Sequence, residues 1–139
     1  MSLYILDTDI LSLFQLGNSV VCRRVAEHPP SDLATTIITV EEQLAGWFTL
    51  RRRVKSTPEL ARVYDRFSQN VQFLARLQVI SFGEQAIGRY EELRRLKLGV
   101  RANDLRIAAI TLESSAILVT RNRVDFALVP GLQIENWSE

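Results

Sequence analysis

The chain of 139 residues has very few of the side chains that build disulfides and zinc sites. It contains one cysteine, Cys22, and one histidine, His28, which excludes an intrachain disulfide, a zinc ribbon and a three-histidine zinc site. No apolar run approaches the ~18 residues of a membrane-spanning helix, and the N-terminus lacks the basic start of a signal peptide. These absences favour a protein of a reducing compartment, the cytoplasm, with no membrane segment.

The composition that remains is that of one folded domain over residues 1–139. Hydrophobic residues make up 47% and charged residues 24% of the chain, which suits a globular core. The net charge of +1 conceals a basic middle, since residues 51–123 carry 15 basic and seven acidic side chains. Most of the basic residues are arginines, which bind phosphate through a planar fork. The middle segment therefore indicates either nucleic-acid binding or solvated helix faces.

Short apolar runs alternate with helical patterns along the whole chain. The runs predict strands at residues 3–6, 33–38, 79–81, 116–120 and 132–137. The helical patterns lie at residues 8–16, 19–27, 40–54, 59–76, 84–97 and from 103 onward. This alternation predicts a three-layer α/β/α fold with a mostly parallel central sheet. The two helices between residues 40 and 76 should form a hairpin after the second strand, and 132–137 should be an edge strand.

Acidic and amide side chains follow these strands or begin a helix beside them: Asp7, Asp9, Glu41, Glu42, Asp104, Asn122 and Asp125. Ligands of such folds bind beyond the carboxyl ends of the strands. Carboxylates gathered in one pocket repel each other unless a cation is present. Mg²⁺ or Mn²⁺ prefers oxygen ligands and activates water and phosphate without a histidine or cysteine. The pattern thus suggests metal-assisted chemistry on a phosphate.

Most of these acids also have a structural interpretation. Glu42 fits a capping box that begins at Thr39, and Asp104 suits the positive end of its helix dipole. Asp9 could cap the first helix, and Asp125 could be a turn residue. Asp7 is the exception, because an acid directly after an apolar strand rarely helps to bury that strand.

Four segments in order resemble the PIN-domain ribonucleases, and among them the VapC-type toxins of bacterial toxin–antitoxin pairs. They are LDTDILS at 6–12, TIITVEEQLAG at 36–46, NDLRIAAI at 103–110 and LVTRNRVDFALVPGLQIENW at 118–137. The resemblance covers nearly the whole chain, and although each segment is weak alone, the four together are specific. It implies a single PIN domain that cleaves RNA with a divalent metal, Mg²⁺ or Mn²⁺.

The family's acidic residues are carried over one position at a time. The resemblance places the first aspartate on Asp7, the glutamate on Glu42 rather than Glu41, and the third acid on Asp104. The fourth position, often an aspartate in the family, is Asn122 here, which offers an oxygen without a charge and puts a second tightly held metal in doubt. Residues that could support these ligands are Asp9, Thr120 and Asp125.

The resemblance also implies a homodimer and a VapB-type antitoxin. The hairpin carries more large apolar side chains than one narrow core face holds: Trp47, Phe48, Leu50, Tyr64, Phe67 and Phe73.

An acidic pocket needs a basic rim to attract RNA. We expect that rim just before Asp104, from Arg94, Arg95, Lys97 and Arg101.

Two other functions remain open at this point. Asp7-Thr8-Asp9 after a strand is similar to the D-x-D motif of haloacid-dehalogenase-like phosphatases, but the two lysines, Lys55 and Lys97, are not at strand ends. A PIN-like fold could also bind RNA or a protein without cutting it, although three of the four acidic positions are present.

Overall fold

The computed structural model describes residues 2–139. In chain order the elements are β1 (Tyr4–Leu6), α1 (Thr8–Gln15), α2 (Ser19–Ala26), a 3₁₀ turn (Pro30–Asp32), β2 (Leu33–Thr36), α3 (Ile37–Arg53), α4 (Thr57–Leu74), β3 (Val79–Ile80), α5 (Glu84–Arg95), α6 (Ala102–Glu113), β4 (Ile117–Val119), α7 (Arg123–Phe126) and β5 (Gln133–Glu135). Each predicted strand and helix is present. The 3₁₀ turn and the four-residue α7 were not predicted, because segments this short have no periodicity to detect.

The strands form one sheet in the order β3-β2-β1-β4-β5, with every neighbouring pair parallel. This confirms the α/β fold with a parallel central sheet, and β5 is an edge strand as expected. From β1 the chain first runs outward through β2 and β3, then returns to the other side of β1 for β4 and β5. The crevice beyond the carboxyl ends of β1 and β4 is therefore the point where the strand order reverses, which is where such sheets bind ligands.

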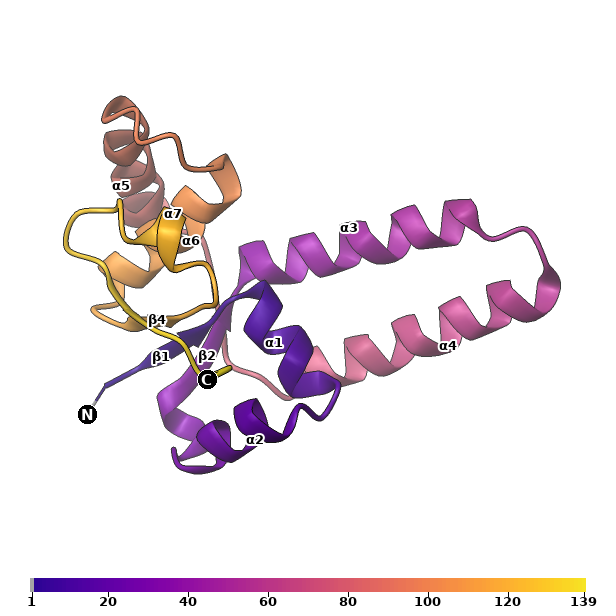
Figure 1. Cartoon of the computed structure of the whole chain (residues 1–139). Helices are drawn as coiled ribbons and strands as arrows, with labels where there is room; N and C mark the ends of the chain where they lie inside the picture. Colours follow the sequence, from indigo (N-terminus) through magenta and orange to yellow (C-terminus); the bar gives the residue numbers. More distant parts are fainter. Residues whose placement is uncertain (1) are drawn as a thin grey trace.

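Successive residues of the central strands point to opposite faces of the sheet, as the strand period requires. Ile5 and Leu118 belong to a core cluster with α5 and α6, whereas Leu6 and Val119 belong to a second cluster with α1 and α2. Figure 1 shows these helices on the two sides of the sheet. Two apolar cores thus hold the sheet from both faces and fix the strand ends that carry the site.

Helices α3 and α4 form the predicted hairpin, which projects away from the sheet (Figure 1). Its base is anchored by the buried residues Ile38 and Leu74, which belong to different core clusters. No helix within residues 2–139 combines the length and apolarity needed to cross a bilayer.

The junction between β2 and α3 differs from the prediction. The β-branched run at 33–38 suggested strand throughout, but β2 ends at Thr36 and α3 begins at Ile37. The reason is the Thr36 hydroxyl, which accepts a hydrogen bond from the Thr39 amide at 3.1 Å and caps the helix. The capping box from Thr39 to Glu42 is therefore wrong, and the Glu42 side chain is not used in a cap.

Candidate active site

Asp7 lies at the end of β1, where the sheet order reverses, and is held there rigidly. One carboxylate oxygen accepts a hydrogen bond from the Ile10 amide at 3.1 Å, so Asp7 rather than Asp9 caps α1. The other accepts a short hydrogen bond from the hydroxyl of Thr120, which follows β4. Only 7% of Asp7 is exposed. The carboxylate is thus fixed by the first turn of α1 and by the residue that follows β4.

Burial raises the pKa of Asp7 from 3.8 to about 6. Burial is the largest cause of this net rise; the charges of Asp9 and Asp104 also contribute to it, and the hydrogen bonds from Thr120 and Ile10 oppose it. Deprotonated Asp7 is therefore electrostatically unfavourable in this position. A positive charge beside it would remove that cost.

A small cavity of about 260 Å³ opens beside Asp7. Oxygen-bearing side chains from three parts of the chain line it: Asp7, Thr8, Asp9, Asp104, Asn122 and Asp125. The structure thus brings together two of the three acids proposed as principal ligands, Asp7 after β1 and Asp104 in the first turn of α6. Asp9 is exposed at the rim, whereas Asp104 is buried.

Glu42 lies beside this acidic pocket but is not part of its lining. Its carboxylate accepts hydrogen bonds from the Thr8 hydroxyl at 2.9 Å and from an Arg101 Nη2 at 3.1 Å. Thr8 and Arg101 both line the pocket, so they connect Glu42 to its edge.

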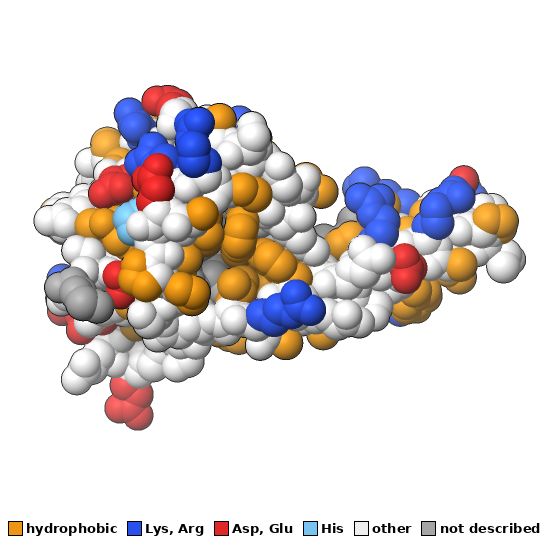
Figure 2. Space-filling view, turned by 90° about the horizontal axis from the view of Figure 1, so that it is seen from below, with side chains coloured by type: hydrophobic (Ala, Val, Ile, Leu, Met, Phe, Trp, Pro, Cys, Tyr) orange, Lys and Arg blue, Asp and Glu red, His pale blue; other side chains and the backbone are white. Residues whose placement is uncertain are grey.

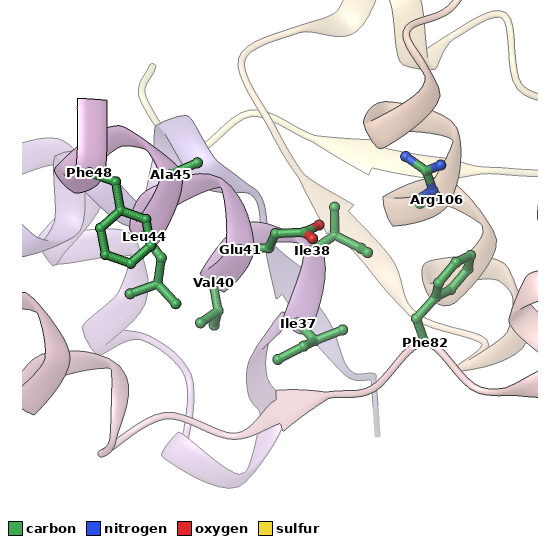
Figure 3. Close-up of a pocket in the computed structure, with 9 residues that line it drawn as sticks. All are labelled: Ile37, Ile38, Val40, Glu41, Leu44, Ala45, Phe48, Phe82 and Arg106. Carbon is green, nitrogen blue, oxygen red and sulfur yellow. The ribbon is translucent and has the colours of Figure 1, made fainter. Parts of the chain in front are cut away.

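Glu41, the neighbour of Glu42 on α3, lines a different cavity. This is an apolar groove of about 700 Å³ between α3 and α6 (Figure 3). Glu41 shares it with Arg106 and Phe82, and no aspartate lines it. This groove is therefore separate from the acidic pocket beside Asp7.

Asn122 and Asp125 bind each other within the acidic pocket. The Asn122 amide group donates to the Asp125 carboxylate at 3.1 Å, and its Oδ1 accepts from the Asp125 backbone N–H at 3.3 Å. Asn122 thereby caps α7, while its own backbone N–H donates to the Thr120 hydroxyl at 3.0 Å. Thr120 thus joins the Asn122 turn to Asp7.

The oxygen atoms of the acidic pocket suit a hydrated divalent cation. Within residues 2–139, no three Asp, Glu, His or Cys side chains are grouped closely enough to hold a metal ion by themselves. The pocket instead offers the carboxylates of Asp7 and Asp104, with Asn122 and Asp125 beside them. Mg²⁺ commonly binds through one or two carboxylates and keeps several waters, so this oxygen-only set fits such an ion.

Of the four residues predicted to form a basic rim, Arg101 alone lines the acidic pocket. Arg94 and Arg95 border a separate shallow cavity with Glu91 at the end of α5, and Arg94 also lies over the Tyr90 ring. Lys97 is exposed beyond α5 with a positive φ of 52°. The rim expected before Asp104 is therefore spread over another surface, because α5 ends away from the pocket.

Two features of the site were missed by sequence reasoning. Thr8 links the pocket to Glu42, and its position inside the Asp7-Thr8-Asp9 triplet was the available signal. Arg121 and Arg123 flank the pocket residue Asn122 in the sequence, and both are exposed.

The chain matches no family model. It is 38% identical to Ribonuclease VapC2 of Rickettsia felis over 71 residues, which are 48% of this chain and 53% of that protein. The match thus spans about half the length of that relative. The chain is also 26% identical to Ribonuclease VapC1 of Haemophilus influenzae (strain R2866) over 140 residues, covering 99% of both proteins.

A solved structure agrees with these relatives in fold. It is the crystal structure of VapBC2 from Rickettsia felis bound to a DNA fragment from the promoter, with a TM-score of 0.72 and 25% identity. The similarity covers 97% of this chain and 98% of that one. In sequence and in fold the chain is similar to VapC-type proteins. Because the VapC1 match covers 99% of this chain, it includes the acidic pocket between β1, α6 and α7.

Proposed function

We propose that this VapC-type chain is a metal-dependent ribonuclease and the toxin of a VapBC-type pair. The observation that carries the proposal is buried Asp7, whose pKa is raised to about 6, in one oxygen-lined pocket with Asp104 at the reversal of strand order. Two relatives are named ribonucleases, which supports the same chemistry. Neither lysine lines the pocket, which disfavours the phosphatase alternative.

Asp7 and Asp104 are the proposed metal ligands, with Glu42 as the third acid and Asn122 as a neutral oxygen. A bound Mg²⁺ or Mn²⁺ would supply positive charge to the scissile phosphate and lower the pKa of water. Thr120 orients the Asp7 carboxylate through its hydroxyl, while Asp9 and Asp125 add negative charge at the rim. Arg101 lines the same pocket and can bind a phosphate of the RNA.

Glu42 is the residue best placed to orient an attacking water or accept its proton. One of its oxygens is fixed by the Thr8 hydroxyl, and the other faces Arg101, which lines the pocket. If Arg101 moves to a phosphate, that second oxygen becomes available to water. The general-base role therefore falls on Glu42, while Asp7 and Asp104 keep the ligand role.

The decisive test is RNA cleavage by the purified chain with and without divalent metal. We expect cleavage of single-stranded RNA with Mg²⁺ or Mn²⁺ and none after exhaustive chelation, with activity restored when metal is returned. p-Nitrophenyl phosphate, a phosphatase substrate, should not be hydrolysed. Full RNA cleavage in chelator would contradict the metal mechanism, and metal-independent RNA binding without cleavage would support the non-catalytic alternative.

We also propose a VapB-type antitoxin as the partner of this chain. The support is similarity over nearly the whole chain to a solved VapBC2 complex. A short gene next to the coding sequence of this chain, encoding a DNA-binding protein, would be the natural candidate for co-expression.

The projecting hairpin supports a homodimer. Along α4 the apolar residues Leu60, Tyr64, Phe67 and Val71 follow a spacing of i, i+4, i+7 and i+11, which places them on one stripe. Leu60, Tyr64 and Val71 are exposed. Figure 2 shows hydrophobic side chains along the hairpin and at its base. A second copy of the chain would cover this stripe.

Sedimentation at micromolar concentration should give a species of about twice 15.8 kDa. Val71→Lys should shift it toward the monomer, because a charge would enter the proposed interface. Gln72→Lys adds the same charge at the neighbouring exposed position and should leave the dimer intact. A wild-type chain that sediments only as a monomer would exclude the dimer at that concentration.

A further inference from the structure

Arg101 spans two acidic residues that are far apart in the sequence. It lies directly before α6, and its guanidinium donates to both oxygens of Asp104, at 2.9 Å from Nη2 and 3.4 Å from Nε. The same Nη2 lies 3.1 Å from a Glu42 oxygen on α3, 59 positions away in the chain. One guanidinium therefore joins the two elements across the edge of the acidic pocket.

Charge explains why the guanidinium is held there. Four carboxylates line the pocket, and among the lining residues Arg101 is the one with a positive side chain. Its hydrogen bond to Asp104 and the nearby charges of Asp104 and Glu42 raise the pKa of Arg101, so it stays protonated. Arg101 thus supplies the positive charge that the acids require when no metal is bound.

The same contacts place Arg101 in competition with a metal ion. Both Asp104 oxygens are engaged by the guanidinium, and a divalent cation on Asp104 would meet a positive charge at hydrogen-bond distance. The Arg101 side chain is 63% exposed, whereas those of Glu42 and Asp104 are 16% and 10% exposed. The arginine can therefore leave toward solvent while both carboxylates remain in place.

A phosphate at the pocket mouth gives the displaced guanidinium a new partner. Arginine binds phosphate with the same two-pronged geometry that it uses for carboxylates. Moving Arg101 from Asp104 and Glu42 to a phosphate would free oxygens for the metal and add a contact to the RNA at once. Binding of either ligand would then favour binding of the other, because the coupling between two sites is reciprocal.

We propose that Arg101 is an internal counter-cation that holds Asp104 and Glu42 in the metal-free protein and transfers to an RNA phosphate when metal binds, so that metal and RNA bind cooperatively. The inference rests on the proposed function, since it assigns a regulatory contact to that same site. Arg101 is a positioning residue in the metal-free state and contacts substrate only after release.

The test is calorimetric titration of the full chain with Mn²⁺. Arg101→Ala should bind Mn²⁺ on the order of tenfold more tightly than wild type, because one competing charge beside the ligands is gone. Arg101→Lys keeps the positive charge but loses the two-pronged guanidinium. Its Mn²⁺ affinity should lie between those of wild type and Arg101→Ala. Arg89→Ala is the matched control: it removes an arginine of the same charge whose ion pair with Glu113 is also 2.9 Å long, outside the acidic pocket. It should bind Mn²⁺ as wild type does.

A second titration tests the coupling to phosphate. A short 2′-O-methyl RNA oligonucleotide, verified to stay intact during the experiment, should raise the Mn²⁺ affinity of wild type severalfold and leave that of Arg101→Ala unchanged. Circular dichroism would establish that each variant is folded, and Arg101→Lys carries the test if the alanine variant is not.

Three outcomes would overturn the proposal. Equal Mn²⁺ affinity in wild type, Arg101→Ala and Arg101→Lys would make Arg101 a structural ion pair only. Weaker binding by Arg101→Ala would mean that the arginine positions the ligands for metal rather than competing with it. Absence of Mn²⁺ binding in wild type and in every variant would show that the acidic pocket is not a metal site. These titrations do not depend on cleavage, so a chain that binds Mn²⁺ as predicted but cuts no RNA would contradict the proposed function and leave this inference standing.

Discussion

Replacement of Asp7 by asparagine is expected to reduce RNA cleavage by about a hundredfold or more, because residues that merely support a metal ligand commonly contribute ~10–100-fold. The change is nearly isosteric and removes one charge. Asparagine also caps helices well, so the hydrogen bond from the Ile10 amide can persist. The new side-chain amide can donate to the Thr120 hydroxyl, whereas the carboxylate accepts from it. The loss should therefore reflect chemistry and metal binding, not unfolding.

Asp9→Asn is the matched control for this experiment. It makes the same chemical change two residues further along and in the same pocket, but Asp9 is exposed at the rim. We expect a much smaller loss of cleavage and a nearly unchanged Mn²⁺ affinity, whereas Asp7→Asn should weaken both. Similar losses in the two variants would show that the pocket acts through its summed charge and that Asp7 has no special position.

The same Asp7→Asn variant is expected to be more stable than wild type at neutral pH when metal is removed. Asp7 has a pKa of about 6 in the folded protein against an ordinary value of 3.8, so the folded state holds this proton more tightly than the unfolded chain. Protonation thus stabilises the fold fully below pH 3.8, and that contribution is lost as pH rises through about 6. Since one pKa unit corresponds to ~1.4 kcal/mol, charged Asp7 costs about 3 kcal/mol above pH 7.

Denaturant unfolding in chelator at several pH values would measure this effect. The difference in the free energy of unfolding between Asp7→Asn and wild type should grow from near zero at pH 4 toward about 3 kcal/mol at pH 8. Added Mn²⁺ should reverse the order, because it would stabilise the wild-type carboxylate alone. A difference that does not change with pH would mean that Asp7 titrates normally.

Much of this fold could be predicted from the sequence because its strands are short, apolar and separated by amphipathic helices. The position of Asp7 followed from one fact, an acid directly after a buried strand. The error at the end of β2 has a local cause: Ile37 and Ile38 are β-branched and extend the apparent strand, while the cap is a single hydroxyl on Thr36. Strand propensity favours Ile37 and Ile38 and takes no account of a hydrogen bond to a single hydroxyl.

The arrangement of the basic residues could not be predicted in the same way. Arg94, Arg95, Lys97 and Arg101 are close in sequence, but the turn after α5 sends them to different surfaces. The contact between Arg101 and Glu42 joins residues 59 positions apart through a long flexible side chain. Such a contact depends on how α3 and α6 pack, which no local pattern encodes.

The pairing of β1 with β4 has a consequence for how the protein is made. Asp7 is synthesised before its partners: its backbone N–H donates to the Val119 carbonyl and its carboxylate accepts from the Thr120 hydroxyl, both more than a hundred positions later in the chain. A nascent chain that ends before β4 has β1 paired on one side only, and it lacks the hydroxyl that orients Asp7. The acidic pocket therefore cannot assemble until β4 and Thr120 have been synthesised. The proposed ribonuclease site is thus incomplete for as long as the part of the chain before Thr120 is being translated.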